Sequence, residues 1–208
     1  MTEYDHEPIR GLPGDLPEGE EILWQGAPDA RTFASSALHT RWVTGYFVLL
    51  AAITLASGSL FGVLAIAISG AFVLGLLHLF ATLVARTTVY TITNRRVVLR
   101  IGVALNKCIN LPLGLLGSAE LRQQQAGFGD ITVKPSGAHR LGYAMLWPHA
   151  RPFRFGAPEP MLRALANADE VAEILARACS QVTTIERSAQ AAGDEAGSTA
   201  LRPAGAVA

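Results

Sequence analysis

One histidine in this chain sits where an imidazole could bind a cofactor. His78 lies in the stretch 42–85, whose 44 residues include no Lys, Arg, Asp or Glu. A neutral imidazole in apolar surroundings can ligate the magnesium of a chlorophyll or the iron of a haem. The alternative is a hydrogen bond from the ring to a helix carbonyl, to a hydroxyl such as that of Ser69 or Thr82, or to a second copy of the chain. The sequence leaves both interpretations open.

No other group of residues has the spacing of a catalytic or metal site. The chain lacks Gly-x-Ser-x-Gly, His-Glu-x-x-His and Cys-x-x-Cys motifs and a glycine-rich phosphate loop ahead of a helix. Cys108 and Cys179 belong to elements expected to face the core, and no pattern brings His139 and His149 together. We therefore expect a protein that is not an enzyme and has no metal site.

The apolar stretch around His78 is long enough for two helices across a bilayer. One crossing needs about 20 apolar residues, and the polar cluster Ser57-Gly58-Ser59 interrupts the stretch near its middle. The composition agrees, because 50% of the 208 residues are hydrophobic, only 16% are charged and the mean hydropathy is +0.30. We predict a transmembrane hairpin over 42–85, with helices at about 42–57 and 60–85. A pair of buried core helices is the alternative.

Basic residues flank the predicted hairpin at both ends, whereas the turn between its helices has no positive charge. Under the positive-inside rule, both termini lie in the cytoplasm and the chain is a multi-pass protein of the cell inner membrane. The basic residues after the hairpin are candidates for contact with the anionic bilayer surface or with a client protein: Arg86, Arg95, Arg96 and Arg100. Because the arginines are spread out and lack interleaved aromatics, no nucleic-acid binding is expected.

Small residues recur along the second predicted helix and predict a helix-packing face. They allow close backbone approach of the small-xxx-small kind, and the face consists of Gly62, Ser69, Gly70 and Gly75. The face packs the hairpin on itself, or it binds a second copy or a client helix. We expect a homodimer on the second interpretation.

The formal net charge of zero hides segments of opposite sign. Residues 1–41 form an acidic N-terminal arm of net charge −5, irregular apart from a first strand near 20–26. Residues 86–181 carry a net charge of +6 and the remainder −1. The basic domain therefore faces a membrane surface or an acidic partner, its own acidic arm included.

Short runs of strand-forming residues follow the hairpin at intervals of about ten residues. They cover 87–93, 97–103, 108–113, 119–123, 129–134 and 142–147, separated by glycine-rich turns. In the first turn, Asn94 suits the left-handed conformation of a tight hairpin. These runs predict a small antiparallel β-sandwich or barrel.

One helix is predicted to close this domain. Asn167 has the character of an N-cap, and apolar residues then recur on one helical face: Val171, Ile174, Leu175, Ala178 and Val182. The domain would span 86–185, followed by a disordered tail at 186–208. The predicted fold class is an α+β membrane protein: a two-helix transmembrane hairpin plus a small antiparallel β-sandwich closed by a C-terminal helix.

Several motifs resemble the bacterial pleckstrin-homology-like (PH-like) domain of membrane proteins. They are the block 90–98 (Tyr-Thr-Ile-Thr-Asn-Arg-Arg-Val-Val), the segments 109–113 and 127–131, and the opening strand 19–26. In that family a small β-sandwich with a C-terminal helix is often fused to paired transmembrane helices. The resemblance implies the same architecture for this chain.

More narrowly, the segments 12–20, 145–152 and 158–163 resemble the PuhB family of purple photosynthetic bacteria, over about residues 10–180. The resemblance implies a non-enzymatic, dimeric assembly factor for the photosynthetic reaction centre, with a secondary effect on the light-harvesting antenna. Its partners would be reaction-centre subunits, antenna proteins and the bilayer of the intracytoplasmic photosynthetic membrane. The alternative is a carrier of bacteriochlorophyll or lipid with His78 as the pigment ligand.

Overall fold

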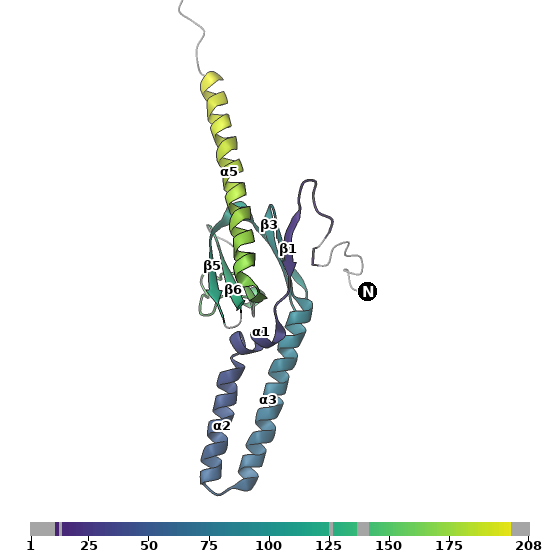
Figure 1. Ribbon diagram of the computed structural model, residues 1–208, viewed down its shortest axis with the longest axis vertical. Coiled ribbons are helices and arrows are strands. Elements are labelled where there is room, and N and C mark those ends of the chain that lie inside the picture. Colours follow the sequence, from purple (N-terminus) through teal and green to yellow (C-terminus); the bar gives the residue numbers. More distant parts are fainter. Residues whose placement is uncertain (1–10, 13, 125–126, 137–141, 201–208) are drawn as a thin grey trace, which may run out of the picture.

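The structure is a computed structural model that describes residues 11–12, 14–124, 127–136 and 142–200. A helical hairpin projects from one end of a β-sandwich, and a long helix extends from the opposite end (Figure 1). The sheets are antiparallel and the fold class is α+β. Both arms of the hairpin enter the sandwich at the same end, as expected for a hairpin inserted between two strands.

Three helices build the projecting part. α1 (Ala30–Ser36) leads into α2 (Thr40–Ala56), and α3 (Leu60–Thr87) returns antiparallel to the sandwich. The turn between α2 and α3 falls at the polar cluster that the sequence indicated. Gly58 has φ +77° there, and the Ser59 hydroxyl caps α3 by accepting the Gly62 N–H.

Among the described residues, α3 is the one helix long and apolar enough to cross a membrane. α2 has 17 residues, and it would form a second such span only when counted together with α1, from which it is bent by 61°. The helices predicted at 42–57 and 60–85 therefore exist. The prediction that both cross a bilayer stays a prediction.

The first sheet joins segments from both sides of the helical hairpin. Its order is β1 (Ile22–Gly26), β2 (Val89–Thr93), β3 (Arg96–Ile101) and β4 (Lys107–Pro112). β1 precedes the hairpin in the chain and β2 follows it, yet the two strands pair directly. The acidic arm thereby supplies β1, the edge strand of the first sheet of the basic domain.

The second sheet completes the sandwich. It contains β5 (Leu116–Gln123), β6 (Phe128–Pro135) and β7 (Met161–Ala166), and the 3-10 turn η1 (Leu113–Leu115) connects the two sheets. Buried apolar side chains of both sheets form one core, which includes Leu99, Ile109, Ile131 and Leu165. α5 (Ala168–Ala200) covers this core with the predicted face, on which Val171, Leu175 and Ala178 are buried and Ile174 and Val182 pack partly buried.

The prediction of a strand at 142–147 is wrong. The segment forms the short helix α4 (Tyr143–Leu146), because the Gly142 carbonyl accepts the N–H groups of Met145 and Leu146. The seventh strand is β7, which the sequence analysis did not identify. Its run of Ala, Leu and Met favours a helix by propensity, but burial between the core and α1 selects the extended form.

The predictions for two asparagines have different outcomes. Asn167 lies directly before α5, at the predicted N-cap position, with φ +51°. Asn94 is not among the described non-glycine residues with positive φ, so its predicted left-handed conformation is wrong. Asn94 instead uses its side chain: Oδ1 accepts the Glu21 N–H at 3.1 Å, and Nδ2 donates to the Gly19 carbonyl at 2.9 Å. Its amide therefore ties the arm to the β2–β3 turn.

The prediction of a disordered tail from 186 is wrong for the described part of that segment. α5 continues to Ala200, and 201–208 lie outside the described residues. The extension has no proline and is rich in Ala, which has the highest helix propensity. The absence of apolar periodicity predicts that this segment does not pack against the core. It does not exclude a helix.

Candidate functional site

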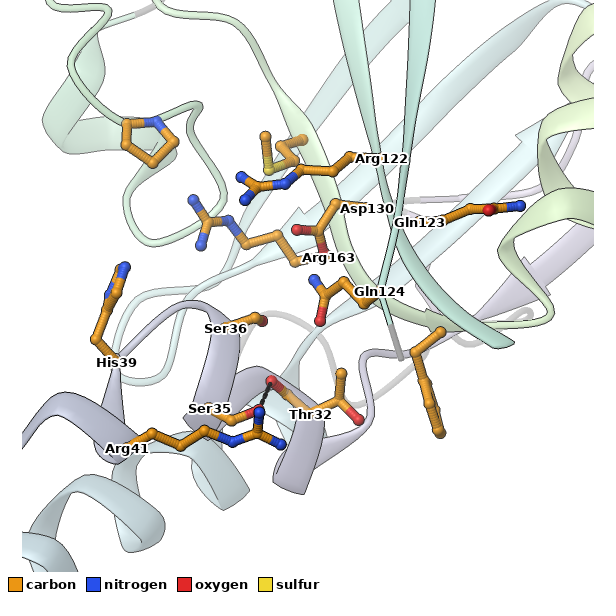
Figure 2. Close-up of a pocket in the computed structure, with 13 residues that line it drawn as sticks. Thr32, Ser35, Ser36, His39, Arg41, Arg122, Gln123, Gln124, Asp130 and Arg163 are labelled. Atoms are coloured by element: carbon orange, nitrogen blue, oxygen red, sulfur yellow. Dashed lines mark hydrogen bonds between the residues drawn. The ribbon is translucent and has the colours of Figure 1, made fainter. Parts of the chain in front are cut away.

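A polar cavity lies where the α1–α2 connection meets the outer face of β5, β6 and β7 (Figure 2). Its volume is about 520 Å³. It is lined by Thr32, Ser35, Ser36, His39, Arg41, Arg122, Gln123, Gln124, Phe128, Asp130, Pro152, Met161 and Arg163. Three arginines and one aspartate give it a positive charge.

Adjacent strands present the charged residues of this cavity. Arg122 on β5 lies directly opposite Asp130 on β6, and Arg163 is on the neighbouring strand β7. The β6–β7 register shifts between Gly129 and Ile131. At this irregularity the Asp130 carboxylate accepts the Ala164 N–H at 2.8 Å, so the buried carboxylate is held by the backbone.

Arg163 is the unusual group of the cavity. Its side chain is buried, with the residue only 5% exposed, and Nη2 donates to the Ala150 carbonyl at 2.9 Å. Its Nε is shielded from solvent and has no hydrogen-bond partner, as is also true of the Ser36 hydroxyl. Burial lowers the pKa of the Arg163 guanidinium, and the charge of Asp130 opposes this effect.

The cationic groups converge in space. Figure 2 shows the Arg122 and Arg163 side chains extending toward the same opening, with the His39 ring on the other side of it. Arg41 lies lower, near Thr32 and Ser35. An unpaired buried N–H beside a second guanidinium favours an anion.

The polar cavity continues into a second one with an apolar lining. The second cavity has a volume of about 530 Å³ and shares Arg122 and Arg163 with the first. Its apolar lining includes Leu38, Leu121, Trp147 and Phe153. Together they form an amphipathic groove, which we call the junction groove, at the base of the helical hairpin.

The aromatic residues of the junction groove link it to the hairpin. Trp147 stacks on Phe80 of α3 with ring centroids 5.6 Å apart. Phe153 is 87% exposed and has φ +63°, a conformation that L-residues with bulky side chains rarely adopt. The fold therefore holds an aromatic ring out into solvent beside the hairpin.

A buried polar cluster fixes the wall behind the junction groove. The Tyr90 hydroxyl lies 2.7 Å from His149 Nδ1, and the Thr88 hydroxyl lies 3.3 Å from His149 Nε2. The backbone N–H of Arg163 donates to the same Tyr90 oxygen at 3.3 Å. The Phe33 ring packs against the imidazole, with ring centroids 5.7 Å apart. Both ring nitrogens thus have partners inside the protein.

Burial sets the charge state of this cluster. It lowers the pKa of His149 to about 3, with a further contribution from the Arg163 charge, and it raises the pKa of Tyr90. At neutral pH both side chains are therefore uncharged. The sequence analysis set His149 aside because a single histidine has no motif, and only its burial shows its role.

Two of the arginines expected at a membrane or client bind the chain's own arm instead. Arg96 forms a bidentate pair with the Glu20 carboxylate, Nε to Oε1 at 2.8 Å and Nη2 to Oε2 at 2.9 Å. Thr93 donates to the same carboxylate, and Arg95 donates to the Glu18 carbonyl at 3.1 Å. Burial by itself would raise the pKa of Glu20, but these hydrogen bonds and charges lower it.

The position of this pair bears on the membrane half of the prediction. β2 begins where α3 ends, so the turn that carries Arg95 and Arg96 lies at the opposite end of the strand from the hairpin. Five strand residues span about 17 Å. Arg95 and Arg96 therefore lie away from any surface that α3 enters.

The other two candidate arginines lie close to the hairpin. Arg86 is exposed in the last turn of α3, where a cation also suits the negative end of the helix dipole. Arg100 is half-buried on β3, directly opposite Val89 at the start of β2. Of the four arginines predicted at a surface, these two occupy the end of the sandwich where that surface would be.

His78 lies on the exposed side of α3. Its Nδ1 is 2.8 Å from the Leu74 carbonyl one turn earlier, and the hydroxyls of Ser69 and Thr82 bind carbonyls of the same helix. The expected alternative partners, Ser69 and Thr82, do not contact the ring nitrogen. A neutral ring that donates from Nδ1 keeps its lone pair on Nε2, the atom that ligates a metal.

The predicted helix-packing face divides into two. A Cβ at Gly70 would lie 2.9 Å from Phe47 Cγ, and one at Gly62 would lie 2.4 Å from Thr54 Cγ2, so both glycines pack α3 against α2. Ser69 is exposed, and a Cβ at Gly75 would have no neighbour within 4 Å. Only Ser69 and Gly75 remain on the outer face, which a second copy or a client helix could reach.

Comparison with known proteins identifies the class. A family model described as bacterial PH domain matches residues 42–178. The chain belongs to this family. It is also similar to a Rhodobacter capsulatus protein described as an uncharacterized 23.7 kDa protein in the puhA 5′ region, with 39% identity over 190 residues, 85% of this chain and 87% of the relative. No solved structure matches the chain.

These findings confirm the resemblance drawn from the sequence motifs. The bacterial PH domain match includes the block 90–98, and the Rhodobacter relative agrees with the resemblance to the PuhB family. The description of the relative assigns it no activity.

Proposed function

We propose that this chain is a membrane-anchored, non-enzymatic assembly factor for the photosynthetic reaction centre, with a secondary effect on the light-harvesting antenna. It acts from the inner membrane and its intracytoplasmic photosynthetic extensions. The gene position of the Rhodobacter relative, in the puhA 5′ region, supports a photosynthesis-related context.

The exposed apolar surface of the hairpin carries the proposal. Large side chains on α3 are mostly exposed: Phe61 is 83%, Phe72 65% and Ile68 63% exposed. Within the described protein, almost none of the most apolar part of α3 is buried. Apolar surface of this extent needs lipid or another protein around it.

The connection of the hairpin to the sandwich supports a specific orientation. Both arms enter one end of the sandwich, so a hairpin that crosses the bilayer would leave the sandwich on one side and the Gly58 turn on the other. The positive-inside rule favours the cytoplasm for the sandwich. Trp42 (80% exposed) and Trp147 lie near the base of the hairpin, as tryptophans do at membrane interfaces.

Labelling with a membrane-impermeant thiol reagent tests this orientation. Ser57→Cys in a Cys108→Ser, Cys179→Ser background is expected to react in intact cells, since the turn then faces the periplasm. The matched position Glu21→Cys, exposed on the sandwich, is expected to react only after the membrane is opened. Reaction of both sites in intact cells, or of neither, contradicts the orientation.

Two surfaces could hold a client in this arrangement. The outer face of α3 around Ser69 and Gly75 is open to a second copy or to a newly inserted helix. The sandwich meets the soluble parts of the same client near the membrane. The partners proposed are reaction-centre subunits first, antenna proteins second, and a second copy of the chain.

A deletion strain tests the function. It is expected to accumulate less reaction centre while pigment synthesis continues, and the wild-type gene restores the level. A Gly75→Val variant, which changes the outer face but no contact within the hairpin, is expected to restore less. Unchanged reaction-centre levels in the deletion strain contradict the proposal.

A bacteriochlorophyll carrier is the second candidate, and the geometry at His78 supports it. The Leu74 carbonyl holds Nδ1, which leaves Nε2 of the exposed ring as the potential magnesium ligand. Protein purified from pigmented membranes would then show a bacteriochlorophyll absorption band that His78→Leu abolishes. Absence of the band, or its retention in His78→Leu, counts against ligation at His78.

A further inference from the structure

We propose that the junction groove binds the phosphate headgroup of an anionic phospholipid. This inference rests on the membrane placement in the proposed function and specifies a ligand that the proposed function does not include. Its polar half would hold the phosphate and its apolar half the upper part of the acyl chains.

The charges of the polar half favour an anion. Arg163 is buried with an unpartnered Nε, and Arg122 forms no ion pair with a described residue. The acidic residue beside them, Asp130, already accepts the Ala164 N–H. A phosphate between the two guanidinium groups would reduce their repulsion, and its oxygens would accept hydrogen bonds from Arg122.

The second acidic residue of the groove, Glu120, is paired with cations of the sandwich. Glu120 binds Lys134 and accepts from Arg151 Nη1 at 2.9 Å. These contacts lower its pKa, the Lys134 hydrogen bond most, so Glu120 stays an anion paired with two cations at neutral pH. It does not offset the charge of Arg122 and Arg163.

The apolar half favours a lipid over a free anion. Leu38, Leu121, Trp147 and Phe153 line the cavity that shares both arginines with the polar half. Inorganic phosphate has nothing to bury there, whereas a glycerophospholipid has apolar carbon next to its phosphate. The joined polar and apolar linings therefore fit an amphipathic ligand.

The location of the groove fits the same ligand. It opens beside the base of α2 and α3, the level at which headgroups lie if the hairpin is in the bilayer. Phe153 is held outward beside it and would enter the interface. The N-terminus of α2, at His39, adds positive potential on the remaining wall.

The test measures lipid binding to the full-length chain in a neutral detergent. Phosphatidylglycerol, phosphatidylcholine with the same acyl chains, and inorganic phosphate are titrated separately, and native mass spectrometry counts the bound molecules. Phosphatidylglycerol is expected to bind about tenfold more tightly than phosphatidylcholine, whose choline cation is repelled by the arginines of the groove, and than inorganic phosphate, which lacks acyl chains.

Variants locate the binding. Arg122→Gln is expected to weaken phosphatidylglycerol binding about tenfold, while Arg177→Gln, a matched exposed arginine on α5, is expected to bind like wild type. Phe153→Ser is expected to weaken lipid binding and leave phosphate binding unchanged. Arg163→Gln would also lose the buried bond to the Ala150 carbonyl and could destabilise the fold. The test therefore uses variants of Arg122 and Phe153.

Three outcomes overturn the inference. Equal binding of phosphatidylglycerol and phosphatidylcholine shows that the groove does not select an anionic headgroup over a zwitterionic one. Unchanged lipid binding in Arg122→Gln places the lipid elsewhere. Phosphate binding as tight as that of phosphatidylglycerol assigns the groove to a free anion. None of these outcomes affects reaction-centre accumulation in the deletion strain, so the assembly role would stand or fall separately.

Discussion

The two ends of the β-sandwich use arginine in opposite ways. At the end away from the hairpin, Arg96 forms a bidentate pair with Glu20 of the chain's own arm. At the hairpin end, Arg163 is buried with an Nε that has no partner, and Arg122 lies beside it. An arginine that is paired within the fold stabilises it, whereas one left unpaired at a groove is available to a ligand.

The largest effect is expected from breaking the paired end. Glu20→Ala leaves the half-buried Arg96 without its carboxylate and also removes the acceptor for Thr93. We expect a loss of about 2 to 3 kcal/mol in the free energy of unfolding, measured by chemical denaturation in detergent. The exposed neighbour Glu21→Ala is the control and should cost less than about 0.5 kcal/mol. Equal stability of the two variants would show that the arm is not held by this pair.

The next effect is a pH dependence that arises at the hairpin end. The pKa of His149 is about 3 in the folded protein and about 6.5 in the unfolded chain. Since the unfolded chain binds the extra proton, the stabilisation is complete above pH 6.5 and falls as the pH decreases toward 3. We expect a loss of about 2 kcal/mol between pH 6.5 and 5.

A variant isolates this slope. His149→Gln removes the titrating group, so its free energy of unfolding should change little between pH 6.5 and 5, although the variant is less stable throughout. A slope that persists in His149→Gln would assign the pH dependence to other residues. Glu20 does not contribute to the slope between pH 6.5 and 5. Its pKa in the folded protein lies below the ordinary value of 4.5, so its effect on stability changes at lower pH.

A smaller effect tests which face of the hairpin is internal. Gly70→Val would press against Phe47 and is expected to cost about 1 to 2 kcal/mol in detergent stability. Gly75→Val, on the open face, is expected to leave the melting temperature unchanged. The reverse order would mean that α3 packs on α2 through its other face.

The smallest effect concerns the exposed arginine of the paired end. The Arg95 side chain donates to the Glu18 carbonyl, and Arg95→Gln should cost less than about 0.5 kcal/mol. It should also leave phosphatidylglycerol binding unchanged. A loss of lipid binding in Arg95→Gln would show that this end, and not the junction groove, faces the bilayer.

The sequence predicted the elements whose signal is local. The face of α5 with Val171, Leu175 and Ala178 follows from helical periodicity, and the α2–α3 turn follows from the cluster around Gly58. The short helix α4 and the strand β7 were not predicted, because tertiary burial outweighs propensity in such short runs.

The candidate site was less predictable because it depends on pairing between distant segments. The arm was expected to be one possible partner of the basic domain, but the Arg96–Glu20 contact joins residues 76 positions apart. The register shift at Asp130 and the burial of Arg163 and His149 leave no mark in the local sequence. Only packing shows which arginines are paired.

Crosslinking in living cells tests the proposed binding of reaction-centre subunits by the chain in the membrane. The tagged chain is crosslinked in photosynthetically growing cells, purified, and its attached proteins are identified by mass spectrometry. Crosslinks are expected from the outer face of α3 and from the sandwich to reaction-centre subunits. Recovery of copies of the chain alone, with no reaction-centre subunit attached, would contradict the proposed binding.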